Sequence, residues 1–261
     1  MLFPKSSIPY ESGPYQLCIE SIQKSKITMK TIIQIALITG IAFACSDQKP
    51  EQKLQIQNKM QKQITPDIPT IGILIFEGFL INEIAAPLDV FTKNDADGNT
   101  LFKVITIAKE AKTYESEEGL VVVPDMLIAE APELKVLIVP SSFRPDLQVA
   151  DSAMIQFIRK QNESTDYIAS HCAGALMLGQ SGIANDKKIV TYVGGAESLQ
   201  KNYPALLVQN DEEVDYILDG KIMSSNGSLV SYPASLALLE KLTSLEHRKH
   251  IENELLYHKL K

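Results

Sequence analysis

A chain of 261 residues, 45% of them hydrophobic, is long enough for one large domain or two small ones with a packed core. Its formal net charge of -7 at pH 7 disfavours a general nucleic-acid-binding protein, because such proteins cluster lysine and arginine. Cys18, Cys45 and Cys172 are too few and too scattered for a disulfide framework or a zinc site, and no Cys-x-x-Cys pair occurs. We therefore expect no metal, no cofactor and no nucleic-acid partner.

The N-terminal quarter of the chain has the layout of a targeting segment. From Met29, a Lys-Thr pair precedes a mostly apolar run, residues 32–44, which matches a secretory signal and is shorter than the roughly 20 residues of a membrane span. Cys45 follows a small residue at the end of this run and resembles the acylated cysteine of a bacterial lipobox. We expect residues 29–45 to be a signal peptide that leads to lipidation at Cys45. A plain cleaved signal and a retained hydrophobic anchor are the alternatives.

The segments on either side of this signal lack the pattern of a folded core. Residues 1–28 contain three prolines and no clear apolar period, so we expect translation to start at Met29 and this extension to be non-native or disordered. Residues 46–69 are rich in glutamine and lysine and contain no aromatic residue, which is typical of a flexible linker. The predicted location is the cell envelope, with the protein lipid-anchored and facing the periplasm or the exterior.

From Thr70 onward, short apolar runs alternate with helical patterns. The apolar run 71–76 predicts a strand buried on both faces, and the next pattern predicts a helix over 81–91 that Pro87 kinks or divides. Further strands are predicted at 102–108, 120–123, 136–139, 167–169, 188–192 and 205–208, a hairpin at 216–223, and helices at 152–161, 197–201 and 231–242. This alternation predicts an α/β domain over 70–245, a flavodoxin-like parallel sheet with helices on both faces.

A mixed-charge helix is predicted over 246–261, after that domain. Its apolar side holds Ile251, Leu255 and Leu256, so it can pack on the domain or on a second subunit. We expect a homodimer. The helix also carries His247, His250 and His258, which we expect to be solvated, since no other kind of metal ligand clusters with them in the sequence.

The segment 167–175 reads as a buried strand that delivers Cys172 into a glycine-containing helix start. Such a strand-to-helix turn is a nucleophile elbow, in which the cysteine sits on a strained backbone beside the free N–H groups of a helix N-terminus. A helix N-terminus is one environment that lowers a cysteine pKa. We therefore expect Cys172 to be accessible and reactive. The alternative is a small buried hydrophobe at a strand-helix junction.

Three segments carry motifs in the order of one known family. They are 71–91, with Phe-Glu-Gly-Phe from Phe76 and Ala-Pro-Leu-Asp from Ala86; 169–192, with Cys-Ala-Gly-Ala from Cys172; and 219–227, Asp-Gly-Lys-Ile-Met-Ser-Ser-Asn-Gly. Together they resemble the ThiJ/PfpI family of the class I glutamine amidotransferase-like superfamily, over about residues 70–245. The resemblance implies that Cys172 is the elbow cysteine and that Glu83 is the acidic residue that hydrogen-bonds it, so the two should titrate as a unit.

Other site residues follow from the same resemblance, with departures from the family pattern. His171 precedes the cysteine, whereas family members with such a histidine place it after, and strand neighbours point to opposite faces. Tyr192 stands where many family enzymes have a histidine. Ser141 and Ser142 replace a Gly-Gly pair whose backbone approaches the reacting atom, so we assign the oxyanion-binding N–H groups to Ser142 and Ala173.

Two functions remain open on the sequence. In the first, Cys172 attacks the electrophilic carbon of a small molecule while Glu83 handles the proton, as in the hydratase, glyoxalase or deglycase, and amidase-like activities of the family. In the second, the same elbow binds a small molecule without catalysis or is oxidised as a redox sensor.

Overall fold

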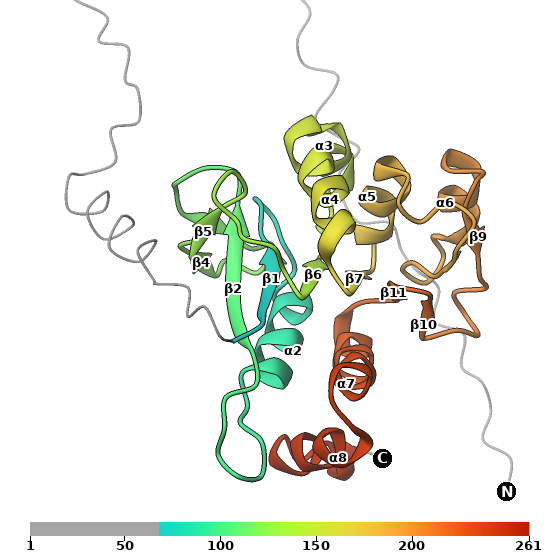
Figure 1. The fold of residues 1–261 in the computed structure, drawn as a ribbon. Coiled ribbons are helices and arrows are strands. Elements are labelled where there is room, and N and C mark those ends of the chain that lie inside the picture. The colour runs from blue at the N-terminus through green and yellow to red at the C-terminus, as the bar shows by residue number, and fades with distance from the viewer. Residues whose placement is uncertain (1–67, 261) are drawn as a thin grey trace, which may run out of the picture. The chain divides into compact units, whose positions relative to one another are not determined.

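The computed structural model describes residues 68–260 (Figure 1). These residues form a seven-stranded sheet in the order β10-β11-β7-β6-β1-β2-β5, together with two separate two-stranded ribbons. The predictions for residues 1–28, for the signal and Cys45 in 29–45, and for nearly all of the linker 46–69 fall outside the described part of the chain. Among the described residues, no helix is both long and apolar enough to cross a membrane.

The main sheet is parallel except for one edge strand. Its members are β1 (Thr70–Leu74), β2 (Lys103–Ala108), β5 (Met126–Leu127), β6 (Val136–Val139), β7 (Tyr167–His171), β10 (Tyr216–Asp219) and β11 (Ile222–Ser225). Strand β10 pairs antiparallel with β11 in the predicted hairpin. All five residues of β1 are buried, because the strand lies in the middle of the sheet with helices on both sides.

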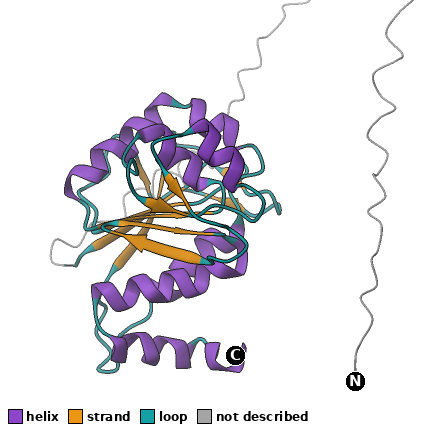
Figure 2. Ribbon diagram, turned by 90° about the vertical axis from the view of Figure 1, so that its right-hand side faces the viewer, coloured by secondary structure: helices purple, strands orange, loops and turns teal. Residues whose placement is uncertain are grey.

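Helices cover both faces of this sheet, as Figures 1 and 2 show. Helices α2 (Ile81–Phe91) and α7 (Ser231–Leu242) pack on one face, with α8 (Leu245–Glu254) beyond α7. The other face is covered by α3 (Pro145–Ala150), α4 (Ser152–Ser164) and α5 (Gly174–Ser181). The remaining helical elements are α6 (Ala196–Asn202) and the 3-10 turns η1 (Ser228–Val230) and η2 (Tyr257–Leu260). The predicted α/β fold is therefore confirmed.

Several predicted elements differ in detail. The predicted strand 120–123 lies outside the main sheet, since β4 (Val121–Val122) pairs only with β3 (Tyr114–Glu115). The predicted strands 188–192 and 205–208 shorten to β8 (Lys188–Ile189) and β9 (Leu207–Val208), which form the second ribbon. Pro87 does not divide α2, which continues from Ile81 to Phe91. Helix α3 and strands β3 and β5 were not predicted, since each has only two to six residues.

The C-terminal helix packs on its own domain, and it is shorter than predicted. It ends at Glu254 near Leu256, which has a left-handed φ of 54°. Ile251 is fully buried against the core, whereas Leu256 is 57% exposed. The expectation of a solvated His247 is wrong, because this side chain is buried and its ring stacks on His250 at 6.2 Å between centroids.

Candidate active site

The predicted site residues come from loops that meet at the carboxyl edge of the sheet. The chain leaves β1 towards β2 on one side, and β6 occupies its other side, so the crossovers diverge between β1 and β6. In open α/β sheets, ligands bind at such a switch point. The loops after β1, β6, β7 and β11 all end here and supply the groups described below.

The turn at Cys172 has the strained backbone predicted for a nucleophile elbow. Cys172 has a φ of 51°, a value that costs a non-glycine residue free energy, and its N–H donates to Ser225 O at 2.9 Å. Helix α5 starts two residues later and runs close to β6: a Cβ atom at Gly174 would lie 2.4 Å from Val139 O. Only glycine fits there, so this residue lets the helix start bring Cys172 to the sheet edge.

Glu83 lies in the first turn of α2 and is completely buried. Its Oε2 accepts a 2.6 Å hydrogen bond from the Ser141 N–H, and the nearby Ser228 backbone also favours the ionised carboxylate. Burial nevertheless outweighs these effects and raises the pKa of Glu83 from 4.5 to about 7. Near neutral pH this carboxyl group can therefore either accept or donate a proton.

The Cys172 thiol is partly buried and protonated at neutral pH. Burial is the main cause that raises its pKa to about 11, and the neighbouring Glu83 carboxylate adds to it. The nearby Ser141 hydroxyl and Ala173 N–H lower the pKa of the thiol, but their effect is weaker. The helix N-terminus therefore does not lower the pKa of this thiol below its ordinary value.

Gly227 closes the site on the side of β11. A Cβ atom at this position would lie 2.4 Å from both Cys172 Cβ and Glu83 Oε1, and the φ of Gly227 is +82°. The glycine backbone therefore lies directly against the thiol-bearing residue and its carboxyl partner. A family motif includes Gly227, but nothing in the sequence signals this contact, which joins residues far apart in the chain.

His171 lies beneath this turn and does not contribute an ionised group. Its Nδ1 is 2.7 Å from Ser225 Oγ, which accepts a hydrogen bond from the Gly227 N–H at 3.2 Å. The ring is buried, and burial lowers the pKa of His171 to about 4, so the side chain is neutral at pH 7. The structure places His171 as a support for the Gly227 turn, with no hydrogen bond to Cys172 among the described residues.

Tyr192 follows Thr191, whose hydroxyl donates to Cys172 O at 3.0 Å. The Tyr192 ring lies over Gly195, where a Cβ atom would approach the ring carbons to 2.6 Å, and the side chain is 37% exposed. No hydrogen bond of its hydroxyl group occurs within the described part of the chain. The contact with the elbow is therefore made by the side chain of Thr191, and the Tyr192 ring packs on Gly195.

The two predicted oxyanion-binding positions differ. The Ala173 N–H lies at the thiol. The side chain of Ser142 donates to Gln148 Oε1 at 2.7 Å, and no interaction of its N–H group with the thiol is recorded among the described residues. The residue that reaches both Glu83 and Cys172 is Ser141. The sequence identified the Ser-Ser pair as unusual, yet could not tell which of the two faces the thiol.

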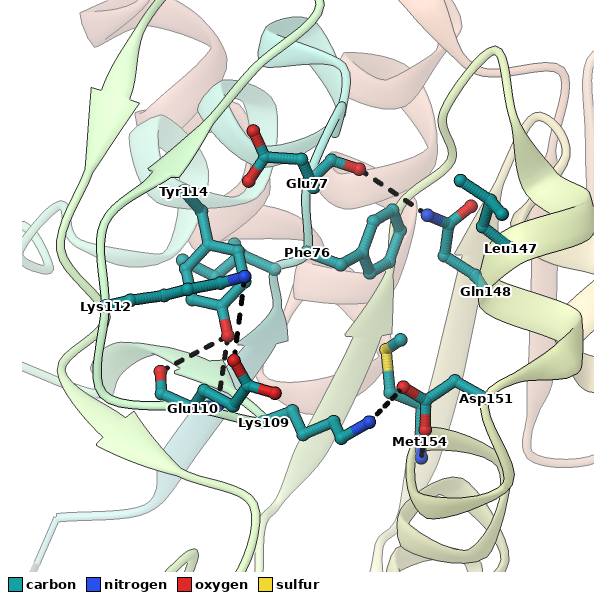
Figure 3. A pocket seen from close by; sticks show the side chains of 11 residues that line it. Phe76, Glu77, Lys109, Glu110, Lys112, Tyr114, Leu147, Gln148, Asp151 and Met154 are labelled. Carbon is teal, nitrogen blue, oxygen red and sulfur yellow. Dashed lines mark hydrogen bonds and ion pairs between the residues drawn. The ribbon is translucent and has the colours of Figure 1, made fainter. Parts of the chain in front are cut away.

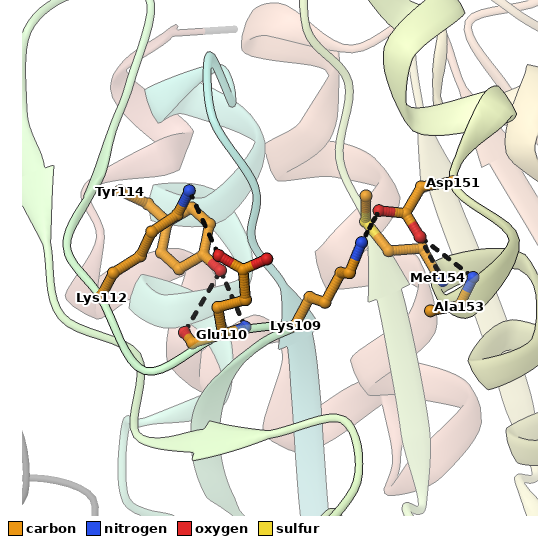
Figure 4. Close-up of polar contacts among 7 residues, drawn as sticks. All are labelled: Lys109, Glu110, Lys112, Tyr114, Asp151, Ala153 and Met154. Atoms are coloured by element: carbon orange, nitrogen blue, oxygen red, sulfur yellow. Dashed lines mark hydrogen bonds and ion pairs between the residues drawn. The ribbon is translucent and has the colours of Figure 1, made fainter. Parts of the chain in front are cut away.

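A cavity of about 190 Å³ lies at the same edge of the sheet, lined in part by Gln148, the residue that accepts the Ser142 hydroxyl (Figure 3). Gln148 Nε2 donates to Glu77 O at 3.5 Å across its rim. The wall of this cavity includes an ion pair between Lys109 Nζ and Asp151 Oδ2, which are 2.7 Å apart (Figure 4). Neither Cys172 nor Glu83 lines this cavity, so the elbow and the cavity are separate features.

No group of three or more histidine, cysteine or acidic side chains within residues 68–260 is arranged to hold a metal ion. The site's chemistry is carried by a thiol, a carboxyl group, a hydroxyl group and backbone N–H donors. The model of the DJ-1/PfpI family matches residues 69–241, which is well over half of the chain. The chain belongs to the DJ-1/PfpI family.

Individual members of the DJ-1/PfpI family are only distantly similar to this chain. An isonitrile hydratase from Pseudomonas putida is 24% identical over 187 residues, which cover 72% of this chain and 78% of the relative. Protein dj-1beta from Drosophila melanogaster is 25% identical over 138 residues, 52% of this chain and 71% of that protein. The crystal structure of a ThiJ/PfpI family protein from Pseudomonas syringae superposes with a TM-score of 0.65 at 20% identity, covering 75% and 81% of the two chains. These likenesses support the fold.

Proposed function

We propose that the protein is an enzyme in which Cys172 adds to the electrophilic carbon of a small uncharged molecule, with Glu83 as the proton acceptor. The observation that carries this proposal is a fully buried carboxyl group with a pKa of about 7 beside a thiol on a strained elbow. A general base is most effective when its pKa lies near the working pH. The similarity to an isonitrile hydratase favours hydration of an isonitrile as the first reaction to test.

The proposed reaction uses only groups at the site and one water molecule. Glu83 takes the thiol proton, and Cys172 Sγ forms a bond to the terminal carbon of the isonitrile. The electron pair left on that carbon takes the proton back from Glu83, which gives a thioimidate. Water then adds to the same carbon and the C–S bond breaks, releasing an N-substituted formamide and restoring the thiol. With an aldehyde or an amide, the π-electron pair moves to oxygen, towards the Ala173 N–H.

The protonated thiol also bears on the redox alternative. Oxidation of cysteine proceeds from the thiolate, so a site that raises the thiol pKa to about 11 slows oxidation by peroxide at neutral pH. The same feature is compatible with catalysis, because Glu83 can remove the proton when an electrophile is bound. This favours the enzyme over a redox sensor.

The proposal is tested by incubating the protein with a panel of small isonitriles, aldehydes and amides and following product formation by NMR. We expect turnover by the wild type, none by Cys172→Ser, and a loss of about 10²–10³-fold in kcat for Glu83→Gln. The rate should increase as the pH rises through about 7, because only the ionised Glu83 accepts the proton. Ser142→Ala is the matched control. Equal turnover by wild type and Cys172→Ser would contradict the proposal.

We further propose that the mature protein is exported, anchored through a lipid on Cys45, and dimeric. The signal-like run before Cys45 supports export and anchoring, and the exposed apolar side chains Val121 and Phe143, 57% and 74% accessible, support association of two copies. Fatty-acid labelling that persists in Cys45→Ala would contradict the anchor. A single monomeric species in detergent-solubilised sedimentation experiments would contradict the dimer.

A further inference from the structure

Ser141 is a buried side chain in direct contact with both members of the proposed pair. It follows β6, is 2% exposed, and its N–H donates to Glu83 Oε2 at 2.6 Å. This bond fixes the residue on the carboxylate side of the site. Its side chain lowers the pKa of both Cys172 and Glu83, so the hydroxyl group lies close to both.

Two buried polar atoms at this place have no hydrogen bond of standard geometry, Ser141 Oγ and Glu83 Oε1. An unsatisfied buried polar atom costs free energy, and folded proteins retain few of them. Glu83 Oε1 and Cys172 Cβ lie close together beside Gly227, since a Cβ atom added to this glycine would lie 2.4 Å from each of them. Because the Ser141 N–H bonds Glu83 Oε2 and its side chain also lowers the pKa of Cys172, the unpaired hydroxyl lies near both groups that can carry negative charge.

We infer that the Ser141 hydroxyl is a catalytic donor that follows the negative charge, bonding the Glu83 carboxylate before proton transfer and the Cys172 thiolate after it. In the transfer, the S–H bond of Cys172 breaks and an O–H bond forms on Glu83. The hydroxyl keeps its own proton and rotates towards sulfur. No oxidant or further reactant is needed. A glycine at this position, as the family resemblance implies for many relatives, offers only its backbone.

The inference rests on the proposed reaction for its consequence, but its test requires no substrate. Full-length protein is labelled with iodoacetamide at a series of pH values, and peptide mass spectrometry reports the alkylation of Cys172 separately from that of Cys18 and Cys45. We expect Ser141→Ala to raise the apparent pKa of Cys172 by about one unit, which lowers the thiolate fraction about tenfold below that pKa. Ser141→Thr keeps the hydroxyl and should label within about twofold of the wild type.

A second pair of variants separates direct donation from an effect through Glu83. In a Glu83→Gln background the thiol loses a carboxylate neighbour, and Ser141→Ala should still raise the Cys172 pKa if the hydroxyl bonds sulfur directly. Disappearance of the effect in that background would overturn the inference, as would wild-type labelling by Ser141→Ala itself. Ser142→Ala, whose hydroxyl bonds Gln148, is the control and should not change the profile. If Ser141→Thr fails to fold by circular dichroism, the Ser141→Ala comparisons still decide the matter.

These outcomes are distinguishable from failure of the proposed function. A shifted labelling profile without turnover of any substrate would support Ser141 as a thiolate donor and count against the enzyme. Turnover of a substrate together with an unshifted labelling profile for Ser141→Ala would support the enzyme and overturn the inference about Ser141.

Discussion

The elbow and the nearby cavity lie at one edge of the sheet, yet buried polar atoms are left without hydrogen bonds at the elbow and are paired in the cavity wall. At the elbow, Cys172 and Ser228 have left-handed φ values, and the buried atoms Ser141 Oγ and Glu83 Oε1 lack hydrogen bonds of standard geometry. In the cavity wall, Lys109 pairs with Asp151, which also accepts bonds from two N–H groups at the start of α4.

This contrast indicates which part of the protein gives up folding stability. Strained backbone and unpaired buried polar groups lower stability and persist where they serve function, whereas paired polar groups add to stability. A search for cavities would not have found the elbow, because neither Cys172 nor Glu83 lines this cavity of about 190 Å³ or the larger one beside Tyr232. Substitutions at the elbow should therefore change reactivity, and substitutions in the cavity wall should change stability alone.

The largest effect is expected from Gly227→Ala. The new methyl group would lie 2.4 Å from Cys172 Cβ and Glu83 Oε1, and alanine also disfavours the φ of +82°. We expect a loss of about 3–4 kcal/mol in the free energy of unfolding by urea, and labelling of Cys172 that differs at least tenfold from the wild type.

Gly98→Ala is the matched control for this substitution. Gly98 has a φ of +84° but no atom within 4 Å of the added methyl group, so it reports backbone strain alone, about 1 kcal/mol. Equal destabilisation by the two variants would show that the elbow is not tightly packed around Gly227.

The sequence predicted the site residues that lie in local motifs, but not the contacts between residues far apart in the chain. Cys172 and Glu83 were found because each lies within a local motif at a strand end or a helix start. The contacts of Ser141 and Gly227 depend on loops that are distant in sequence and meet only when β6, β7 and β11 pair in parallel. The fold was predictable because buried strands and amphipathic helices leave local periodic patterns, while the two-residue strands β3 and β5 and the six-residue helix α3 are too short to leave one.

A smaller effect, which depends on pH, is expected from His171→Asn. The folded-state pKa of His171, about 4, lies below its ordinary value of 6.5, so the neutral ring contributes stability above pH 6.5 that is lost as the pH falls towards 4. This loss amounts to about 3 kcal/mol in the wild type, whereas the asparagine side chain of the variant does not titrate. The variant should be less stable than the wild type at pH 7 by about 1–2 kcal/mol. The gap should close between about pH 5.5 and 5, and near pH 4 the variant should be the more stable protein.

Urea titrations at pH 7, 5.5 and 4 measure this gap. A gap that does not change with pH would mean that His171 is not a buried neutral base. Because its ring reaches Cys172 only through Ser225 and Gly227, iodoacetamide labelling at pH 8 should change by less than about threefold. A tenfold change would place His171 in the reactive part of the elbow and remove the distinction between support and chemistry.

The smallest effect is expected in the cavity wall, from Lys109→Met. The lysine is 42% exposed, so its ion pair with Asp151 is screened by water and salt, and the melting temperature should fall by no more than about 2 °C. Asp151→Ala should lower it further, because the carboxylate also caps α4 through the N–H groups of Ala153 and Met154. Neither variant should alter labelling of Cys172 or turnover. A change in reactivity with either one would show that the cavity and the elbow form one functional site, since Gln148 and Ser142 connect the two through a continuous pair of hydrogen bonds.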